Sequence, residues 1–403
     1  FHDLTDLIDQ YAPTLKASIP DFVWKSPQVS KNGRIYGIPA MWPKPDTRVI
    51  YYRKDWLEKA GMTEMKTLDD VLKFFEYVKN NDMNGDGDPN DEVGFMVREQ
   101  MSYSDVFFGS FGAHPTMWVM RDGQFVPSMI TEEMKEAVAF WKYLYDQGYV
   151  NQNMFTNKAA DWDGAIRSGK AAMWMHDAAN YSGWSRSFTD DPADMSIIGY
   201  MPAPEGPNGH AYIRGKRSGI YFVHVIPSKT ENVIDILKYF EWVYTSQEAA
   251  DFFHYGIEGV NWRRDGDKIV FDGVPKPLTS LEERDRQRFQ LVYNPKGVGY
   301  EDDEILALSP VGDIIMKGFE YAEKSAMPDD SLFLPVFDLM TQRPELRPAT
   351  TTGSMFMDMF AKVITGREPL DSAFDNFVKD WKARGGDQLI KEATEWHKEY
   401  FGN

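Results

Sequence analysis

Short apolar runs alternate with helical patterns of apolar and polar residues along the whole chain. Near the start, Ile35–Ile38 predicts a short buried strand that Pro39 stops, and Val49–Tyr52 is β-branched and aromatic, as strands are. Residues 53–60 then repeat their apolar side chains at helical spacing. The pattern therefore predicts two strands followed directly by a helix.

Helical and strand patterns go on alternating through the rest of the chain. Residues 67–70 form a capping signature for one amphipathic helix, and a second amphipathic helix is expected to begin at Thr131 with acidic residues in its first turn. Apolar runs at 171–175 and 219–226 predict further buried strands, and helix dominates from residue 231 onward. This alternation indicates an α/β fold, here with two mostly parallel sheets.

Composition narrows the kind of protein. A chain of 403 residues, 42% of them apolar, is long enough for two or three domains with sizeable cores. The net charge of −18 argues against nucleic acid as a partner, because phosphate backbones attract positive surfaces. The sequence has no cysteine, which excludes disulfides and thiolate metal sites, and it has no apolar run long enough to span a membrane.

The segment 82–92, DMNGDGDPNDE, has the spacing of a calcium loop. Side-chain oxygens stand at loop positions 1, 3, 5 and 9, and Gly87 at position 6 allows a tight turn, as a hard cation with many oxygen ligands requires. Asp88 would bind through its carbonyl, and either Asp91 or Glu92 would complete the shell, because position 12 is Val93 and not glutamate. The alternative interpretation is a solvated acidic turn. An ion here is expected to be structural, and a strand, not a helix, is expected to follow.

Aromatic side chains gather around residues 162–184, where a predicted strand ends in Asp177. Aromatic faces offer sugars a flat apolar platform, and Asp and Asn side chains bond their hydroxyl groups. Trp174 alternates into the strand and fits the core better. Trp184 follows a Ser-Gly pair in a stretch too polar for a core helix, so we expect it on a loop, as a ligand anchor whose loss leaves the fold intact.

Basic residues concentrate in the loop 212–217, which contrasts with the acidic rest of the chain. If the loop faces ligand, Lys216 or Arg217 would pair with a carboxylate or sulfate of an acidic glycan. An ordinary solvated loop explains the pattern equally well.

Catalytic motifs are missing from the sequence: it has no nucleophile elbow, P-loop, HExxH or dinucleotide fingerprint. The carboxylate pairs that a glycosidase would need are Glu301–Glu304 and Asp161 with Asp163, and both fit helix starts, where acidic residues offset the helix dipole. We therefore expect no enzyme. A calcium-dependent carbohydrate-active enzyme and a cell-surface carbohydrate-binding adhesion module remain the alternatives.

Two motifs carry a family resemblance. Asn32–Pro39 reads NGRIYGIP and Tyr51–Leu57 reads YYRKDWL, which resemble the DGKIYGIP and YNKDWLEKAG motifs of the solute-binding proteins of ABC sugar importers. The likeness continues through Ile257–Gly259 and the tail Trp381–Leu389. It implies a type II periplasmic-binding-protein-like α/β fold with two lobes, and part of the first lobe is expected to be absent before Phe1. The implied lobes are 1–48 with 222–325, and 49–221 with 326–403.

The resemblance also implies the protein's role. It suggests a monomeric extracellular receptor, lipid-anchored or periplasmic, that captures an oligosaccharide, with an acidic one left open, and delivers it to an ABC transporter permease by hinged closure of its lobes. Alginate-type and glycosaminoglycan-type members have a similar helix-loop-strand Ca²⁺ site, which implies the ligands Asp82, Asn84, Asp86, Asp88, Asn90 and Asp91. The candidate ligand-binding residues are Trp42, Tyr103, Asp177, Asn180, Tyr181, Trp184, Arg217 and Trp262.

Overall fold

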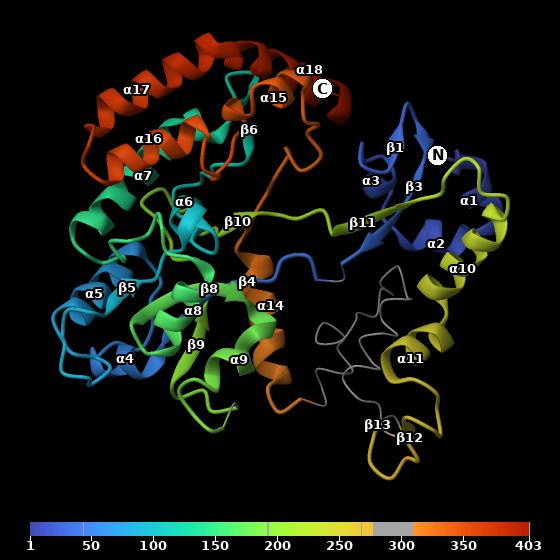
Figure 1. Ribbon diagram of the computed structural model, residues 1–403, viewed down its shortest axis with the longest axis horizontal. Helices are drawn as coiled ribbons and strands as arrows, with labels where there is room; N and C mark the ends of the chain where they lie inside the picture. Colours follow the sequence, from blue (N-terminus) through green and yellow to red (C-terminus); the bar gives the residue numbers. More distant parts are fainter. Residues whose placement is uncertain (43, 192, 267, 277–308, 403) are drawn as a thin grey trace. The chain divides into compact units, whose positions relative to one another are not determined.

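The computed structural model describes residues 1–42, 44–191, 193–266, 268–276 and 309–402, which form two compact units (Figure 1). Unit 1 comprises Phe1–Pro45 and Arg217–Asp313, and unit 2 comprises Asp46–Lys216 and Ile314–Asn403. The chain thus passes from one unit to the other after residues 45, 216 and 313. The sequence predicts that the chain passes between the two lobes after residues 48, 221 and 325, and these lobe boundaries stay a prediction.

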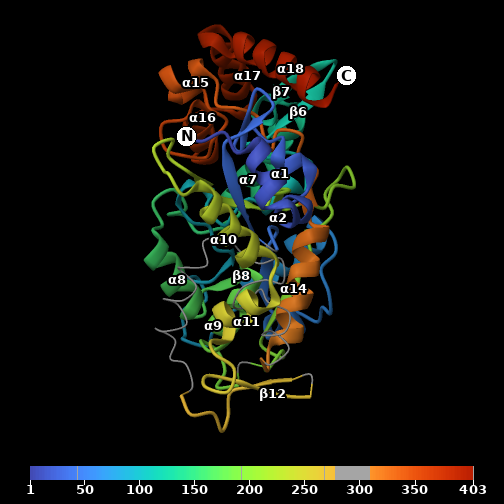
Figure 2. The same ribbon diagram turned by 90° about the vertical axis from the view of Figure 1, so that its right-hand side faces the viewer.

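Unit 1 combines short two-stranded sheets with the helices that pack together beside them. Helix α10 packs against α1 and α2, and Figure 2 shows the three together. Their apolar faces enclose a core that includes Ile8, Leu15 and Phe240. The elements of this unit are α1 (Thr5–Tyr11), α2 (Pro13–Ser18), α3 (Asp21–Trp24), β1 (Ser30–Lys31), β2 (Arg34–Ile35), β3 (Gly37–Met41), β11 (Ile220–Val225), α10 (Val233–Thr245), α11 (Gln247–Tyr255), β12 (Arg263–Asp265) and β13 (Lys268–Val270).

Strands β3 and β11 correct two expectations. Pro39 does not stop a strand but lies inside β3, opposite Val223 of β11. Proline is tolerated on an edge strand, and these two strands form a two-stranded sheet within the described residues. The run around β11 was predicted to be buried, yet Phe222 is 51% exposed. Its apolar character reflects strand propensity more than burial.

Unit 2 holds the larger sheet and the larger core. Its strands are β4 (Arg48–Arg53), β5 (Val93–Phe95), β6 (Trp118–Arg121), β7 (Gln124–Pro127), β8 (Ala171–Asp177), β9 (Ile198–Met201), β10 (Arg214–Gly215) and β14 (Ala326–Met327). Its helices and helical turns are α4 (Lys54–Lys59), α5 (Leu68–Lys79), η1 (Glu99–Met101), α6 (Val106–Gly109), η2 (Ser128–Ile130), α7 (Glu132–Asp146), α8 (Ala159–Arg167), η3 (Ala178–Asn180), α9 (Tyr181–Ser185), α14 (Gly312–Lys324), which begins two residues before the boundary, α15 (Asp338–Gln342), η5 (Pro344–Leu346), α16 (Met355–Ile364), α17 (Leu370–Trp381), η6 (Lys382–Gly386) and α18 (Asp387–Phe401).

The four-stranded sheet of unit 2 has the order β5-β8-β4-β9. Strand β4 runs antiparallel to both β8 and β9, and β5 runs parallel to β8. The expectation of a mostly parallel sheet is therefore wrong for this unit. Local patterns indicate that a segment is a strand, but the direction of its partner depends on where the connecting chain returns.

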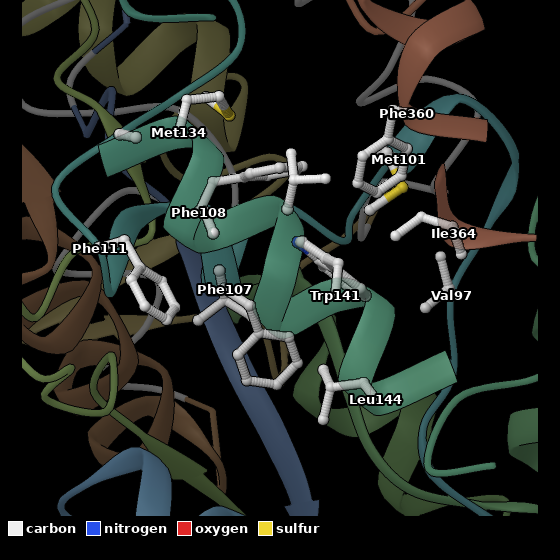
Figure 3. Packing of buried hydrophobic residues seen from close by; sticks show 14 of the residues in the cluster. Val97, Met101, Phe107, Phe108, Phe111, Met134, Trp141, Leu144, Phe360 and Ile364 are labelled. Atoms are coloured by element: carbon white, nitrogen blue, oxygen red, sulfur yellow. The ribbon is translucent and has the colours of Figure 1, made fainter. Parts of the chain in front are cut away.

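Helix α7 is central to the core of unit 2 (Figure 3). The hydroxyl of Thr131 accepts a hydrogen bond from Met134 N, so this threonine caps the helix as its position predicts. Trp141, on the buried face, lies among Phe107, Phe108 and Phe360 with ring centroids 5.3–6.4 Å apart. Thr67 forms a capping box with Asp70 at the start of α5, again as predicted.

Candidate ligand-binding site

A polar cluster lies where strands β4 and β8 meet their loops. Arg48 is the first residue of β4 and Asp177 the last of β8, and the antiparallel register places the two opposite each other. Tyr103 reaches the same place from the segment after η1, since its hydroxyl donates a hydrogen bond to Asp177 Oδ2 over 3.2 Å. Two residues predicted for the site, Tyr103 and Asp177, are thus brought together within unit 2.

The carboxylate of Asp177 is held by three donors but remains 32% exposed. Its Oδ1 accepts hydrogen bonds from the Thr47 hydroxyl at 2.7 Å and from Arg48 Nε at 3.3 Å. Burial acts to raise the pKa of Asp177, but the charge of Arg48 and the Thr47 hydroxyl outweigh it and keep the pKa below its usual value. Asp177 is therefore an ionised hydrogen-bond acceptor that solvent can reach.

Tyr103 provides a flat aromatic layer beside this carboxylate. The guanidinium carbon of Arg48 lies 3.6 Å from the centroid of the Tyr103 ring, and His176 stacks on the ring with centroids 4.5 Å apart and planes 7° apart. Burial lowers the pKa of His176, so the imidazole is neutral at physiological pH. Cation, phenol and imidazole hold one another in place by stacking.

A second carboxylate, that of Asp105, adds negative charge near Arg48. Asp105 Oδ2 lies 3.3 Å from His114 Nε2. Burial acts to raise the pKa of Asp105, but the bond to His114 and the charges of Arg48 and Arg214 lower it to about 2. The site thus contains two carboxylates, Asp177 and Asp105, and the positive charge of Arg48 lowers the pKa of both.

The backbone that presents Tyr103 is strained. Gln100, Met101 and Tyr103 have φ values of 57°, 55° and 54°, although none is glycine. Such left-handed residues are uncommon and cluster at functional sites, where the surrounding structure holds them. This run supports a functional role for the cluster and was not foreseen from the sequence.

Trp184 and Tyr181 do not lie where the sequence suggested. Both belong to the short helix α9 and are buried, with Trp184 only 2% exposed. Trp184 packs on Trp174 and Trp162 at centroid distances of 5.6 and 5.5 Å, and the Tyr181 hydroxyl donates to Ile198 O. The expectation of an exposed Trp184 loop is wrong, because α9 turns the ring back onto β8. Asn180, just before α9, is exposed.

The three candidates in unit 1 differ in exposure. Trp42 follows β3, is half-buried and meets Tyr221 edge-on at 4.6 Å. Arg217 is exposed and donates to Pro45 O at 3.3 Å. Trp262 is 1% exposed and donates through Nε1 to Gly256 O, so its ring is part of the local core and offers no open face. Contact of Trp42 or Arg217 with ligand stays a prediction.

Sequence reasoning missed Thr47, Arg48 and Asp105. The sequence did contain a signal for Arg48. It stands at the start of one predicted strand and Asp177 stands at the end of another, and these two ends meet if the strands pair antiparallel. Asp105 has no such signal, since its role depends on His114 and on Arg214, a residue far along the chain. Of the carboxylates weighed for catalysis, Asp163 pairs with Arg167 on α8, and residues 301–304 lie outside the described residues.

The acidic loop 82–92 folds back on its own oxygens. Asp82 accepts hydrogen bonds from Gly85 N and Gly87 N at 2.7 and 2.9 Å, and Gly87 has a φ of 94° that favours glycine. Asn84 and Asp86 likewise accept bonds from backbone amides two residues on. Strand β5 follows the loop, as predicted.

Two buried carboxylate oxygens in this loop lack partners among the described residues. They are Oδ1 of Asp91 and Oε2 of Glu92, a residue only 5% exposed. The other oxygen of Asp91 lies 2.5 Å from Lys170 Nζ. In the described part of the chain no three His, Asp or Glu side chains converge as a metal centre. The oxygen-rich donor set, which includes amide and main-chain oxygens, nevertheless fits a hard cation.

Comparison with known proteins places these features in a family. The model of the family described as bacterial extracellular solute-binding protein matches residues 3–250. The chain is 28% identical over 383 residues to lipoprotein LipO of Bacillus subtilis, a match that covers 92% of this chain and 72% of the relative. It is 23% identical over 387 residues to the polygalacturonan/rhamnogalacturonan-binding protein YtcQ of the same organism, with the same shares covered.

Solved structures share the fold. Alginate-binding protein AlgQ2 without calcium ion matches with a TM-score of 0.68 at 17% identity, over 99% of this chain and 82% of that one. The FusA substrate-binding protein of an ABC transporter of S. pneumoniae, an EF-hand mutant in complex with fructo-nystose, matches with a TM-score of 0.66 at 18% identity, over 100% and 84%. The prediction of a type II periplasmic-binding-protein-like α/β fold is confirmed.

Proposed function

The chain belongs to the bacterial extracellular solute-binding proteins, and from this premise we propose that it binds an oligosaccharide without transforming it and delivers it to the permease of an ABC transporter. Relatives and structural neighbours named for sugars or polysaccharides support this function. The name of LipO supports a lipid anchor on the cell surface. Among the described helices, none has both the length and the apolar composition that a membrane crossing needs.

The observation that carries the proposal is the solvent-accessible carboxylate of Asp177, which Thr47, Arg48 and Tyr103 hold in place. Sugar hydroxyls donate hydrogen bonds to an ionised acceptor, and a few well-placed polar groups fix the orientation of a bound ligand. In this cluster the acceptor is already oriented by Thr47 and Arg48, which reduces the entropy lost on binding.

Calorimetric titration with a panel of oligosaccharides tests the function, and chromatography of the recovered sugar tests whether it is returned intact. We expect Asp177→Asn to weaken binding about ten- to hundred-fold, because hydrogen bonds to charged groups contribute about 1.5–3 kcal/mol. Asp380→Asn is the matched control: Asp380 is exposed on α17 and should leave the affinity unchanged. Cleaved sugar would favour the enzyme alternative, and equal affinities for the two variants would remove Asp177 from the site.

We further propose that loop 82–92 binds a structural Ca²⁺ through Asp82, Asn84, Asp86, Asn90 and Asp91, with Asp88 contributing its carbonyl. The unpartnered oxygens of Asp91 and Glu92 support this, because uncompensated buried carboxylates are costly. Glu92 supports the loop from within, as its Oε1 accepts bonds from Met83 N and Asn84 N. The bound ion would compensate the negative charge of the carboxylates in the loop that joins α5 to β5, and its role would be structural.

Melting curves in calcium and in chelator test the metal site. A ligand at a hundred times its Kd stabilises the native state by about 2.7 kcal/mol, so calcium should raise the melting temperature by several degrees. Asp82→Ala should abolish the difference, and Asp380→Ala should keep it. Identical curves with and without calcium, together with no heat of calcium binding, would contradict the proposal.

A further inference from the structure

Arg48 is oriented by its neighbours while its outer nitrogens stay unused. Its Nε donates to Asp177, and its guanidinium carbon lies over the ring of Tyr103, 3.6 Å from the ring centroid. The side chain is still 19% exposed, and neither Nη1 nor Nη2 makes a hydrogen bond to any residue that the structure describes. The contact with Tyr103 and the Nε hydrogen bond thus hold the guanidinium group in one position, and its two terminal nitrogens remain available to a ligand.

Two further arginines contribute positive charge to this cluster. The pKa of Tyr103 is raised, chiefly by burial, although the positive charges of Arg48 and Arg98 act to lower it. Arg214 acts together with Arg48 on Asp105. Arg98 Nε is buried and has no hydrogen-bond partner in the described part of the chain. In a chain with a net charge of −18, these arginines around Tyr103 and Asp105 are a local concentration of positive charge.

The carboxylates that face these arginines are already compensated. Asp177 accepts from Thr47, Arg48 and Tyr103, and Asp105 lies against His114. Asp329 lies near His114 and accepts hydrogen bonds from Ser331. Asp177 and Asp105 thus already have partners, and the terminal nitrogens of Arg48 remain available to a further negative group.

We propose that the oligosaccharide carries an anionic oxygen group, a uronate carboxylate or a sulfate, and that the terminal nitrogens of Arg48 bind it. The inference rests on the proposed oligosaccharide function and adds the chemical class of the ligand. A guanidinium fork matches the two oxygens of such a group in a bidentate way, which an ammonium does not. Asp177 then remains the acceptor for neighbouring hydroxyl groups.

The test is calorimetric titration of the whole protein with matched sugars. Trimers of galacturonate, mannuronate and glucuronate are each compared with their carboxyl-reduced neutral counterparts, and a sulfated trimer is tested beside them. We expect at least one anionic trimer to bind ten-fold or more tightly than its neutral counterpart, with sodium chloride weakening only the anionic ligand. Binding of the sulfated trimer alone would identify sulfate as the group.

Two substitutions at one position separate charge from geometry. Arg48→Met keeps an apolar side chain against Tyr103 and should weaken the anionic ligand about ten- to hundred-fold. The neutral counterpart should be weakened less, because it loses only the orientation that Arg48 gives to Asp177. The affinity of Arg48→Lys for the anionic ligand should lie between those of the native protein and Arg48→Met, because lysine keeps the charge but lacks the two parallel N–H donors of a guanidinium. Arg367→Met, on an exposed loop between α16 and α17, is the matched control that should bind normally.

The outcomes are separable from those of the proposed function. Tight binding of a neutral oligosaccharide with no anionic preference, or an anionic ligand whose affinity is unaffected by Arg48→Met, would overturn the inference and leave the oligosaccharide function standing. Failure of every sugar, neutral and anionic, would overturn the function itself. If Arg48→Met melts at a lower temperature than the native chain, its weaker binding could come from a disturbed fold. The salt dependence of binding by the native protein then tests the charge of the ligand without any substitution.

Discussion

Trp184 lies in a closed aromatic environment inside unit 2. Tyr51, Trp162 and Trp174 surround its ring with centroids 5.5–6.4 Å away. The guanidinium carbon of Arg167 lies 4.5 Å from the ring centroid. A ring enclosed in this way stabilises the fold and has no face left for a sugar, so its role is the reverse of the ligand anchor that the sequence suggested.

Trp184→Ala should therefore lower the free energy of unfolding by about 3–5 kcal/mol, the usual loss for a buried tryptophan. Urea unfolding followed by tryptophan fluorescence and circular dichroism measures it. Trp242→Ala is the control, because Trp242 is partly exposed on α10 and should cost clearly less. An unchanged unfolding midpoint combined with lost sugar binding would restore Trp184 as a ligand contact.

The short element η1 determines where Tyr103 lies. It places Gln100 and Met101 in left-handed conformations one after the other, and Tyr103 follows two residues later. A left-handed conformation costs a residue with a side chain about 1–2 kcal/mol, while glycine adopts it freely. The side chain of Gln100 is exposed, so its strain is relieved by removing the Cβ without opening a cavity.

Gln100→Gly should consequently stabilise the protein by about 0.5–1 kcal/mol, after the extra entropy of glycine in the unfolded chain is subtracted. The melting temperature would rise by one or a few degrees. Lys391→Gly, at an exposed position of α18, is the contrasting control and should lose about 1 kcal/mol. If the two variants lose stability equally, the left-handed conformation of Gln100 is not strained.

At the scale of the whole molecule, the two units have separate cores. The core around Phe240 contains only residues of unit 1, and the core around Trp141 contains only residues of unit 2. Cooperativity depends on shared buried contacts, and units with separate cores often unfold in separate steps.

Scanning calorimetry should therefore show more than one unfolding transition. Phe240→Ala should lower the transition temperature of unit 1 alone, and Trp141→Ala that of unit 2 alone. Each shift should correspond to a loss of about 3–5 kcal/mol in the free energy of unfolding of that unit. A single transition whose calorimetric and van't Hoff enthalpies agree, shifted by both substitutions, would show that the units unfold together.

The sequence alone determined features that depend on near neighbours. The caps at Thr67 and Thr131, the stripe along α7, and strand β4 with the helix after it are all where the pattern predicts them. The turn of loop 82–92 is equally local, because its oxygens accept bonds from amides two to nine residues away. Such features follow from residues that are close in the chain, so a single sequence contains the information for them.

Only the tertiary structure decided which side chains meet and which are buried. Asp177 pairs with Arg48 across 129 positions of the chain, and Trp184 is buried by residues from other elements. The same holds for the direction of β4 against β8 and for the exposure of β11. Exposure and long-range pairing depend on where distant segments pack, and local composition does not carry that information, because an aromatic residue suits a core and a binding surface equally well.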